Sequence, residues 1–225
     1  YVVEVDNKIY IFEAGLKYAD DKLLGVDYII PNYDYLKENK DKIVGIFITH
    51  GHDNQIGALA DILVDMPDIK VYGGKFTLEI IKQDLKENGI ESANLIEVVA
   101  HKKINFGSET IFPIQVSHSI PDSFLYVLNT NDGAIVFSGN YVFDPAIRGH
   151  YSTDIGKLAY IGKQGVLCLM NESIYAEKKG FSSPKHRASD LIRTTIVENE
   201  GRIFFNIFET QNNHIYNIIK PPKRQ

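Results

Sequence analysis

Short runs of β-branched and aromatic residues, separated by turn-forming residues, dominate the first third of the chain. The runs Val2–Val5 and Lys8–Phe12 flank Asp6-Asn7, a dipeptide that favours a two-residue hairpin turn. Residues 43–49 are almost all apolar, as is typical of a strand that is buried on both faces. This part of the sequence therefore predicts a hairpin followed by a central strand.

The spacing of apolar residues becomes helical after the central strand. Residues 56–64 follow the 3.6-residue period of a helix, and residues 76–88 form an amphipathic helix that ends before Gly89. Lys70–Gly73 separates them as a strand. Downstream, the pattern predicts strands over residues 110–116, 124–129, 134–138, 165–170 and 202–208, a helix over residues 186–198, and a helix beginning near Asn212. Strands that come first in a hairpin and then alternate with helices indicate a layered α/β protein, in which helices cover sheets.

Composition narrows the class of protein. A chain of 225 residues with 44% hydrophobic composition can bury a full core, as one large domain or two small ones. The net charge of −5 does not fit a strongly basic nucleic-acid-binding domain. Any contact with RNA would have to come from local patches, such as Lys102-Lys103 and Lys178-Lys179, although charge pairs in loops are usually just solvated.

The single cysteine, Cys168, lies in the apolar run over residues 165–170, and we expect it to be buried as a small hydrophobic side chain. One cysteine excludes a disulfide framework, which favours a cytoplasmic protein. No apolar run approaches the roughly 20 residues that are needed to cross a bilayer, so no membrane span is expected.

The loop after the central strand carries the candidate chemistry. His50 and His52 stand at positions i and i+2, so both imidazoles can point at one ion, and Gly51 allows the backbone to turn tightly between them. Two polar loop residues are the plain alternative, and the two histidines alone do not decide between these interpretations. The residues that follow, 53–57, favour a metal site.

Five separated segments resemble the ribonuclease J family of metallo-β-lactamase/β-CASP ribonucleases. They are Phe12–Lys17, Leu24–Pro31, Phe47–His52, His118–Ser123 and Gly165–Leu169. The resemblance extends from Tyr1 to about Ile219. It implies an α/β (α+β) fold: a metallo-β-lactamase αββα sandwich whose first part spans residues 1–177, the beginning of an inserted β-CASP domain over residues 178–219, and an unassigned tail over residues 220–225. Because the family continues beyond these parts, we expect the natural protein to be longer.

The resemblance also implies a site for two divalent ions, zinc or manganese, that serves phosphodiester hydrolysis. The residues that match the ligands of one ion are His50, His52 and His118, and all three are retained. The family holds the other ion with an Asp and a His at the positions of Asn54 and Gln55. The final ligand of the family, a distant histidine, lies beyond this chain.

The bridging Asp of the family falls at Asn140, so three positions of the two-ion site carry amides, namely Asn54, Gln55 and Asn140. An amide oxygen is a weak, neutral ligand for a dication, so the second ion is expected to bind poorly. Without two ions the clamp on the attacking and leaving oxygens is missing, and Asn54 cannot accept a proton from an attacking water. We therefore expect at most one ion, and weak or absent catalysis.

Other positions of the resemblance are mixed. Glu13 stands where the family commonly has an Asp that orients ligands, although it can equally form a plain hydrogen bond to the loop. Glu172 matches an acidic β-CASP motif and is expected to orient a partner. The 5′-phosphate-binding stretch of the family aligns with the candidate substrate contacts Thr210, Asn213 and His214, where its Arg and His are displaced or lost. Three histidines match no ligand position and are expected at the surface: His101, His150 and His186.

Three functions remain open from the sequence. The first is a degenerate ribonuclease J paralogue, like the second copy found in Gram-positive bacteria, that binds RNA and supports an active sister enzyme in a hetero-oligomer, or forms a homodimer. The second is a working 5′-3′ exoribonuclease, with endoribonuclease activity, that uses one ion. The third is a small-molecule metallo-hydrolase, which the long ribonuclease J-like segments disfavour. We expect the first: an RNA-processing and RNA-decay subunit in the cytoplasm.

Overall fold

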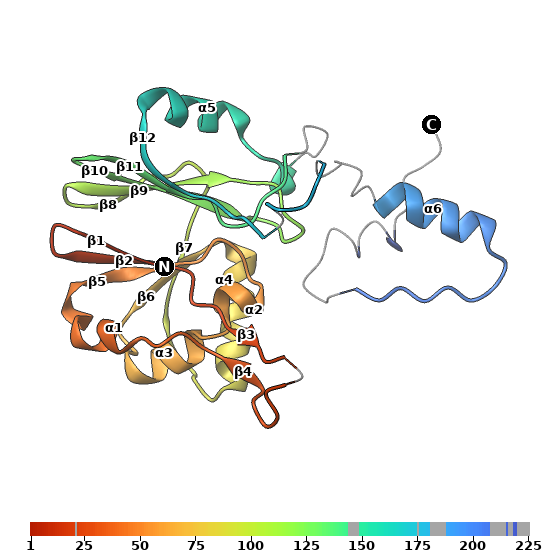
Figure 1. The fold of residues 1–225 in the computed structure, drawn as a ribbon, viewed down its shortest axis with the longest axis horizontal. Coiled ribbons are helices and arrows are strands. Elements are labelled where there is room, and N and C mark those ends of the chain that lie inside the picture. The colour runs from red at the N-terminus through yellow and green to blue at the C-terminus, as the bar shows by residue number, and fades with distance from the viewer. Residues whose placement is uncertain are drawn as a thin grey trace.

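The computed structural model describes residues 1–20, 22–143, 149–174, 176–180, 188–207, 215 and 218–219. Two five-stranded sheets pack face to face, and helices cover the outer face of each sheet (Figure 1). This four-layered arrangement confirms the predicted α/β fold class and its αββα order. The division at residue 177 into two domains stays a prediction.

The first sheet has the strand order β1-β2-β5-β6-β7. Its strands are β1 (Val2–Val5), β2 (Lys8–Phe12), β5 (Ile43–Phe47), β6 (Lys70–Gly73) and β7 (Asn94–Glu97). The hairpin β1-β2 is antiparallel and all the other pairs are parallel. Both turn residues, Asp6 and Asn7, have positive φ, at 47° and 63°, as the mirror-image turn of a two-residue hairpin requires. The predicted hairpin is therefore confirmed.

The second sheet has the strand order β12-β11-β10-β9-β8. Its strands are β8 (Ile104–Phe106), β9 (Glu109–Gln115), β10 (Phe124–Thr130), β11 (Gly133–Phe137) and β12 (Val166–Met170). Neighbours pair antiparallel except β11 and β12, which are parallel and are joined across the outer face by α5 (Ile155–Gln164). The sequence predicted four of these strands, but neither β8 nor α5.

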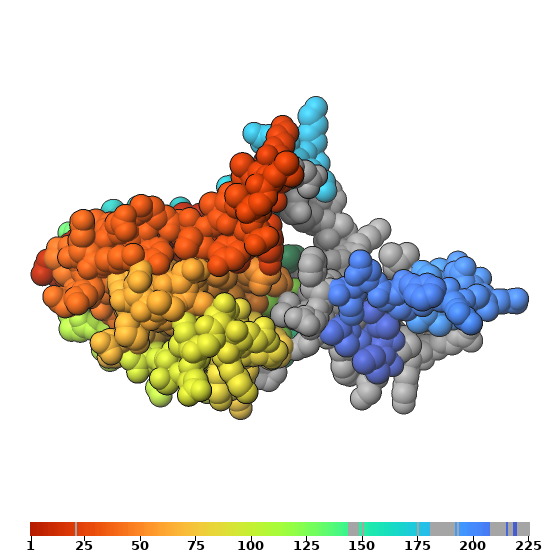
Figure 2. Space-filling view, turned by 90° about the horizontal axis from the view of Figure 1, so that it is seen from below, coloured from red at the N-terminus to blue at the C-terminus, as the bar shows by residue number. Residues whose placement is uncertain are grey.

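Four helices cover the first sheet, namely α1 (Asp34–Glu38), α2 (Asp53–Ile56), α3 (Leu59–Asp65) and α4 (Lys75–Glu87). Single 3-10 turns are η1 (Lys40–Lys42) and η2 (Gly149–Tyr151). The short strands β3 (Lys17–Tyr18) and β4 (Tyr28–Ile29) form a separate hairpin that projects from the body of the molecule (Figure 2). The helix α6 (Ala188–Glu198) lies outside the four layers (Figure 1).

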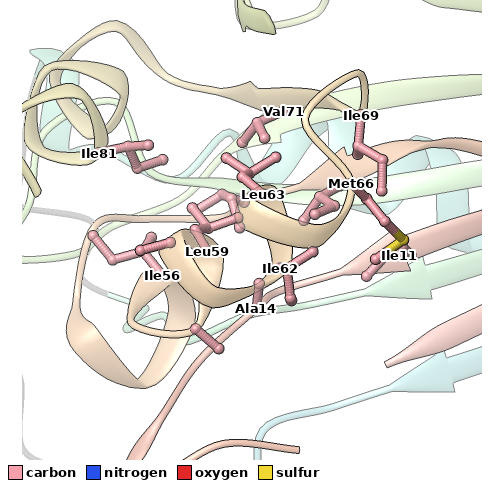
Figure 3. Close-up of a cluster of buried hydrophobic side chains, with 14 of the residues drawn as sticks. Ile11, Ala14, Ile56, Leu59, Ile62, Leu63, Met66, Ile69, Val71 and Ile81 are labelled. Carbon is pink, nitrogen blue, oxygen red and sulfur yellow. The ribbon is translucent and has the colours of Figure 1, made fainter. Parts of the chain in front are cut away.

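Three apolar clusters hold the layers together. Side chains of α3 and α4 pack on the first sheet (Figure 3). An aromatic cluster fills the space between the sheets, where the rings of Phe47 and Tyr72 stack at 4.6 Å. A third cluster lies between the second sheet and α5. Because burying one large apolar side chain stabilises a fold by about 1.5–3 kcal/mol, these clusters supply the rigid frame on which the loops are held.

The helix predicted over residues 56–64 is interrupted: α2 ends at Ile56, and α3 begins at Leu59. A Cβ on Gly57 would lie 2.5 Å from the side chain of Leu16. The carbonyl oxygen of Ala14 accepts the N–H of Ala58 at 2.8 Å, which takes that donor out of the helical ladder. The loop that follows β2 therefore docks at this break, which ties it to the candidate site.

Two further predictions were wrong. Residues 202–207 form no strand: Phe204 is 89% exposed, and no described strand pairs with this segment, so its extended pattern has no ladder to join. Cys168 is exposed, because β12 is the edge of its sheet and its neighbours Leu167 and Leu169 are about 60% exposed. The apolar run was correctly predicted as a strand, but its burial was not.

The predicted helix over residues 186–198 is confirmed from Ala188 onward. The predicted helix start at Asn212 lies outside the described residues, although Ile215 and Ile218 are helical. Within the part of the chain that the structure describes, no helix is both long enough and apolar enough to cross a membrane.

Candidate metal centre

The loop from Ile48 to His52 follows β5 and is held by both sheets. The Ile48 N–H donates to the carbonyl of Tyr72 at 2.8 Å, and the hydroxyl of Tyr126 donates to the carbonyl of Ile48 at 2.8 Å. The N–H of Phe124 donates to the carbonyl of Thr49 at 3.0 Å. The loop therefore sits at the end of the central strand, fixed from each side, before His52 begins α2.

His118, from the loop between β9 and β10, meets His50 and His52 at this point. One ring nitrogen of each histidine lies within 4.8 Å of the others, and the ring centroids are 4.1–5.1 Å apart. Zinc bonded to imidazole nitrogens at 2.0–2.1 Å brings those nitrogens to roughly 3.3 Å from one another. The structure therefore brings the three predicted ligands together, with their nitrogens up to 4.8 Å apart.

His50 is fully buried, and its two ring nitrogens differ. Nδ1 lies 2.9 Å from the hydroxyl oxygen of Thr49, whereas Nε2 has no hydrogen-bond partner among the described residues. Buried polar atoms are almost always paired, so an orphaned imidazole nitrogen beside two other histidines indicates a place for an electrophile. This atom is the strongest structural sign that the cluster suits a metal ion.

The three imidazoles are held in the neutral form that binds metals. Burial lowers the pKa of His50 well below its usual value, and the neighbouring charges of His118 and His52 lower it further. Burial, and then the charge of His52, lowers the pKa of His118 to about 3. Burial also lowers the pKa of His52, although Asp53 opposes the shift. Neutral imidazole has the lone pair that a ligand needs.

His118 is less well prepared than His50. Its Nδ1 accepts the N–H of Ile120 at 3.2 Å, which leaves the proton of the neutral ring on Nε2. Ligation through Nε2 would require the other tautomer and the loss of this hydrogen bond. The cluster therefore offers one free nitrogen at His50 and one engaged nitrogen at His118.

Glu13 forms hydrogen bonds to the histidine loop, as the plainer of its two interpretations predicted. Its carboxyl accepts the hydroxyl of Thr49 and, at 3.3–3.4 Å, the N–H of the same residue. Burial raises the pKa of Glu13 to about 8, and the two hydrogen bonds from Thr49 oppose that shift. The sequence had suggested Glu13 but had given no role to Thr49, which links Glu13 to His50.

Main-chain contacts hold the part of the loop that carries Asn54 and Gln55. Asn54 is exposed, while Gln55 is buried and its Oε1 has no partner among the described residues. The N–H of Ala14 donates to the carbonyl of Gln55 at 2.7 Å, and a Cβ on Gly15 would lie only 1.9 Å from the carbonyl oxygen of Asn54. The backbone at these positions is thus tightly constrained.

Asn140 is half-buried and follows Gly139, whose φ of +55° favours glycine. A Cβ on Gly139 would lie 2.7 Å from the side chain of Thr49, so this segment packs directly on the histidine loop. Glu172 lies nearby, since its N–H donates to the hydroxyl of Ser138 at 3.1 Å. Its carboxylate accepts the N–H of Ile174 and so faces its own loop.

The remaining predicted residues do not join the cluster. His101 is exposed, stacks on Phe112 and pairs with Asp154 at 3.3 Å, as expected of a surface histidine. The candidate substrate contacts Thr210, Asn213 and His214 lie outside the described residues. His186 and the side chain of His150 also lie outside them.

No family model matches the chain. Ribonuclease J 2 of Staphylococcus aureus is 36% identical over 220 residues, which cover 97% of this chain and 39% of that protein. Ribonuclease J 2 of Staphylococcus saprophyticus is 34% identical over 225 residues, which cover 100% of this chain and 40% of that protein. The chain thus spans about two fifths of the length of these relatives.

A crystal structure of a protein of unknown function from Enterococcus faecalis V583 has the same fold. It superposes with a TM-score of 0.66 at 15% identity, over 99% of this chain and 60% of that one. At this identity the likeness concerns the fold alone. The relatives at 34–36% identity, matched over almost the whole chain, are more specific. By these matches the chain belongs to the ribonuclease J family, and it is similar to the members named ribonuclease J 2.

Proposed function

We propose that this chain is part of a ribonuclease J-type subunit that binds RNA, holds at most one metal ion and has weak or lost hydrolytic activity. The observation that carries the proposal is the contrast within one loop. His50, His52 and His118 converge with a free nitrogen at His50, whereas amides occupy the positions of the second ion.

The residues define what the site can do. One ion on three imidazoles, zinc or manganese, would polarise a phosphate oxygen as a Lewis acid. Asn54 and Gln55 can donate and accept hydrogen bonds but cannot hold a second dication well. Asn54 also cannot take a proton from water, so general-base catalysis is lost at that position. Each 1.36 kcal/mol of lost transition-state stabilisation slows a reaction about tenfold, so these losses together suppress turnover.

The same proposal extends to the rest of the protein. Residues 1–177 form the first part of the metallo-β-lactamase sandwich, residues 178–219 begin a β-CASP domain, and residues 220–225 are unassigned. Glu172 orients its loop at this boundary. The subunit works in the cytoplasm, in RNA maturation and decay, and pairs with an active sister ribonuclease J or with a second copy of itself.

The decisive experiment compares the protein with a triple revertant, Asn54→Asp, Gln55→His and Asn140→Asp, on 5′-monophosphorylated RNA with manganese or zinc. The unaltered protein is expected to cleave at the background rate, and the revertant at least about 100-fold faster, since it regains ligands worth several kcal/mol. His52→Ala in both backgrounds is the control, because it removes a retained ligand.

The alternative is an active 5′-3′ exoribonuclease that uses the three retained histidines. Robust cleavage by the unaltered protein, abolished by His52→Ala, would establish this alternative and refute the degenerate site. Elemental analysis gives an independent reading: one ion or none per chain supports the proposal, whereas two tightly held ions contradict it. Co-purification with the sister enzyme tests the supporting role.

A further inference from the structure

We propose that the start of α4 is a binding site for a phosphate group, beside the loops that carry the three histidines. The N–H groups of residues 75–77, the hydroxyl of Thr77 and the ammonium group of Lys75 form the site. The inference rests on the proposed function for its ligand, because the phosphate would belong to RNA. It involves no metal ion, so it can be tested in the metal-free protein.

The first turn of α4 lies against both loops that carry the histidines. β6 runs parallel to β5, so α4 begins at the same edge of the sheet as the loop after β5. The Cα of Thr77 lies 3.6 Å from the position that a Cβ would take on Gly51, the residue between the two histidines of that loop. From the other loop, the carbonyl oxygen of Asp122 lies 2.3 Å from the position of a Cβ on Gly74. Ligands of α/β proteins commonly bind at this edge of a sheet.

The close packing at Gly74 leaves α4 without a side-chain cap. Gly74 is the N-cap residue, and a residue with a Cβ would collide with Asp122, so no capping side chain fits there. Among the described residues, no group accepts the N–H of residues 75–77. The helix α5 differs, because the carboxylate of its N-cap residue Asp154 accepts the N–H of Lys157 at 2.9 Å. The start of α4 therefore keeps its donors available for an acceptor from outside the helix.

The side chain of Thr77 is a second, independent sign of a ligand at this place. It is fully buried, yet its hydroxyl has no hydrogen-bond partner among the described residues. Side chains of a helix lean towards its N-terminus, and the methyl group of Thr77 lies 3.5 Å from the position of a Cβ on Gly73. The hydroxyl is therefore at the same end of α4 as the N–H groups. Since buried hydroxyls are almost always paired, we expect an acceptor here.

The charges of the first turn favour an anion. The aligned peptide dipoles place partial positive charge at the start of α4, and Lys75 adds a full positive charge there, while the turn contains no acidic residue. Asp122, on the neighbouring loop, carries the opposing charge, and Lys75 offsets it. Several N–H donors, a hydroxyl and a cation match the oxygens of a phosphate group, which helix N-termini commonly bind. Free phosphate and the phosphate of RNA share this chemistry, so the test has an arm for each.

The first arm adds inorganic phosphate to the metal-free protein at about pH 8, where phosphate is mainly a dianion, and follows the ¹⁵N–¹H amide signals. We expect the signals of residues 75–77 to shift and saturate, while those of residues 155–157, at the capped start of α5, stay unchanged. Thr77→Val should weaken binding about tenfold, because it removes a hydrogen bond to a charged group at nearly constant shape. Thr77→Ser is the matched control and should bind as the unaltered protein does.

A second pair of variants keeps the test decisive if Thr77→Val does not fold. Lys75→Pro removes one N–H donor together with the charge, and proline suits the first position of a helix, whereas Lys75→Gln removes the charge alone. Phosphate affinity should be lower in Lys75→Pro than in Lys75→Gln. Amide signals that never shift would overturn the site, and so would an affinity that neither Thr77→Val nor Lys75→Pro lowers.

The second arm separates this site from the proposed function. It measures binding of a 5′-monophosphorylated RNA oligonucleotide by fluorescence anisotropy, again in the metal-free protein. Weaker binding by Thr77→Val than by Thr77→Ser supports RNA as the source of the phosphate. If inorganic phosphate binds and the oligonucleotide does not, the site stands and the proposed RNA role fails. If the oligonucleotide binds both variants equally and inorganic phosphate does not bind, the site is refuted and the RNA role stands.

Discussion

Two buried polar clusters lie at opposite ends of the same sandwich, and they are built differently. At the start of β2, the buried carboxylate of Glu109 accepts hydrogen bonds from Lys8, Tyr10 and Ser108. The hydrogen bond from Lys8 holds the pKa of Glu109 below its usual range. Beyond the end of β2, the cluster around His50 contains several buried atoms that have no hydrogen-bond partner among the described residues. They are His50 Nε2, Gln55 Oε1 and Thr77 Oγ1, the last from the first turn of α4, beside Gly51.

The difference distinguishes a structural network from a binding site. A closed network leaves no buried polar atom unsatisfied and contributes only to the fold. An open cluster keeps atoms desolvated without compensation, which costs free energy unless a ligand supplies the missing interactions. The molecule therefore holds two kinds of buried polar cluster in the same frame, and experiment can test the proposal that only the open one binds a ligand.

The largest expected effect is stabilisation of the open cluster by zinc. At zinc concentrations about 100 times the Kd, binding to the folded state alone raises the free energy of unfolding by about 2.7 kcal/mol. His50→Leu should abolish this increase, measured by urea denaturation with and without zinc. The exposed His101→Leu is the matched control and should keep it. An equal zinc effect in His50→Leu would contradict the site.

The closed cluster should respond in the opposite way. Glu109→Ala leaves the buried Tyr10 hydroxyl without its acceptor, so the melting temperature should fall by about 5 °C while zinc affinity stays unchanged. Ser108→Ala, which removes one donor and keeps the carboxylate, should have a smaller effect. The comparison fails if Glu109→Ala weakens zinc binding as strongly as it lowers the melting temperature.

The pH dependence of the metal-free protein should report on the open cluster. Burial lowers the pKa of His118 from about 6.5 in the unfolded chain to about 3. The folded state therefore binds fewer protons, and the stability from this residue is present above pH 6.5 and lost as the pH falls towards 3. His118→Gln should flatten this slope by up to about 1.4 kcal/mol per pH unit.

The contribution of Glu13 to stability should depend on pH in the opposite direction. Its pKa is raised from the usual 4.5 to about 8, so the folded state retains a proton that the unfolded state has lost. The stability from this residue is present below pH 4.5 and is lost as the pH rises through 8. Urea titrations of Glu13→Gln should show less loss between these limits. An unchanged profile would mean that Glu13 is ionised throughout.

The smallest expected effect concerns Gln55. Its buried Oε1 lacks a partner, so Gln55→Leu removes an unsatisfied acceptor and should stabilise the metal-free protein by about 1 kcal/mol. The neighbouring exposed Asn54→Leu is the control and should change stability by less than about 0.5 kcal/mol. Destabilisation by Gln55→Leu would show that this amide belongs to a satisfied network after all.

The sequence was most informative where structure is determined locally. The turn at Asp6-Asn7 and the strand over Lys70–Gly73 were predicted to the residue, because turn chemistry and short apolar runs define them. The exposure of Cys168 could not be predicted, since burial of a strand depends on what packs against it. The segment over residues 202–207 has strand-like composition but no described partner strand.

In the candidate site, too, the sequence predicted the local features but not the contacts between distant segments. His50 and His52 were apparent from their spacing, and His118 from the resemblance to ribonuclease J. The link through Thr49 was not apparent, because it depends on the left-handed backbone of Glu13, which no rule predicts for a glutamate. Long-range hydrogen bonds of this kind appear only when the strands β2 and β5 are placed side by side.

The close approach of Gly15 to the carbonyl of Asn54 has a consequence for how the protein tolerates mutation. Position 15 admits no other residue without moving the loop, whereas the exposed side chain at position 54 can change freely. A saturation mutagenesis library read out by folding should therefore show intolerance at position 15 beside wide tolerance at position 54. Because main-chain contacts set the shape of the loop, Asn54→Asp and Gln55→His should leave its backbone in place.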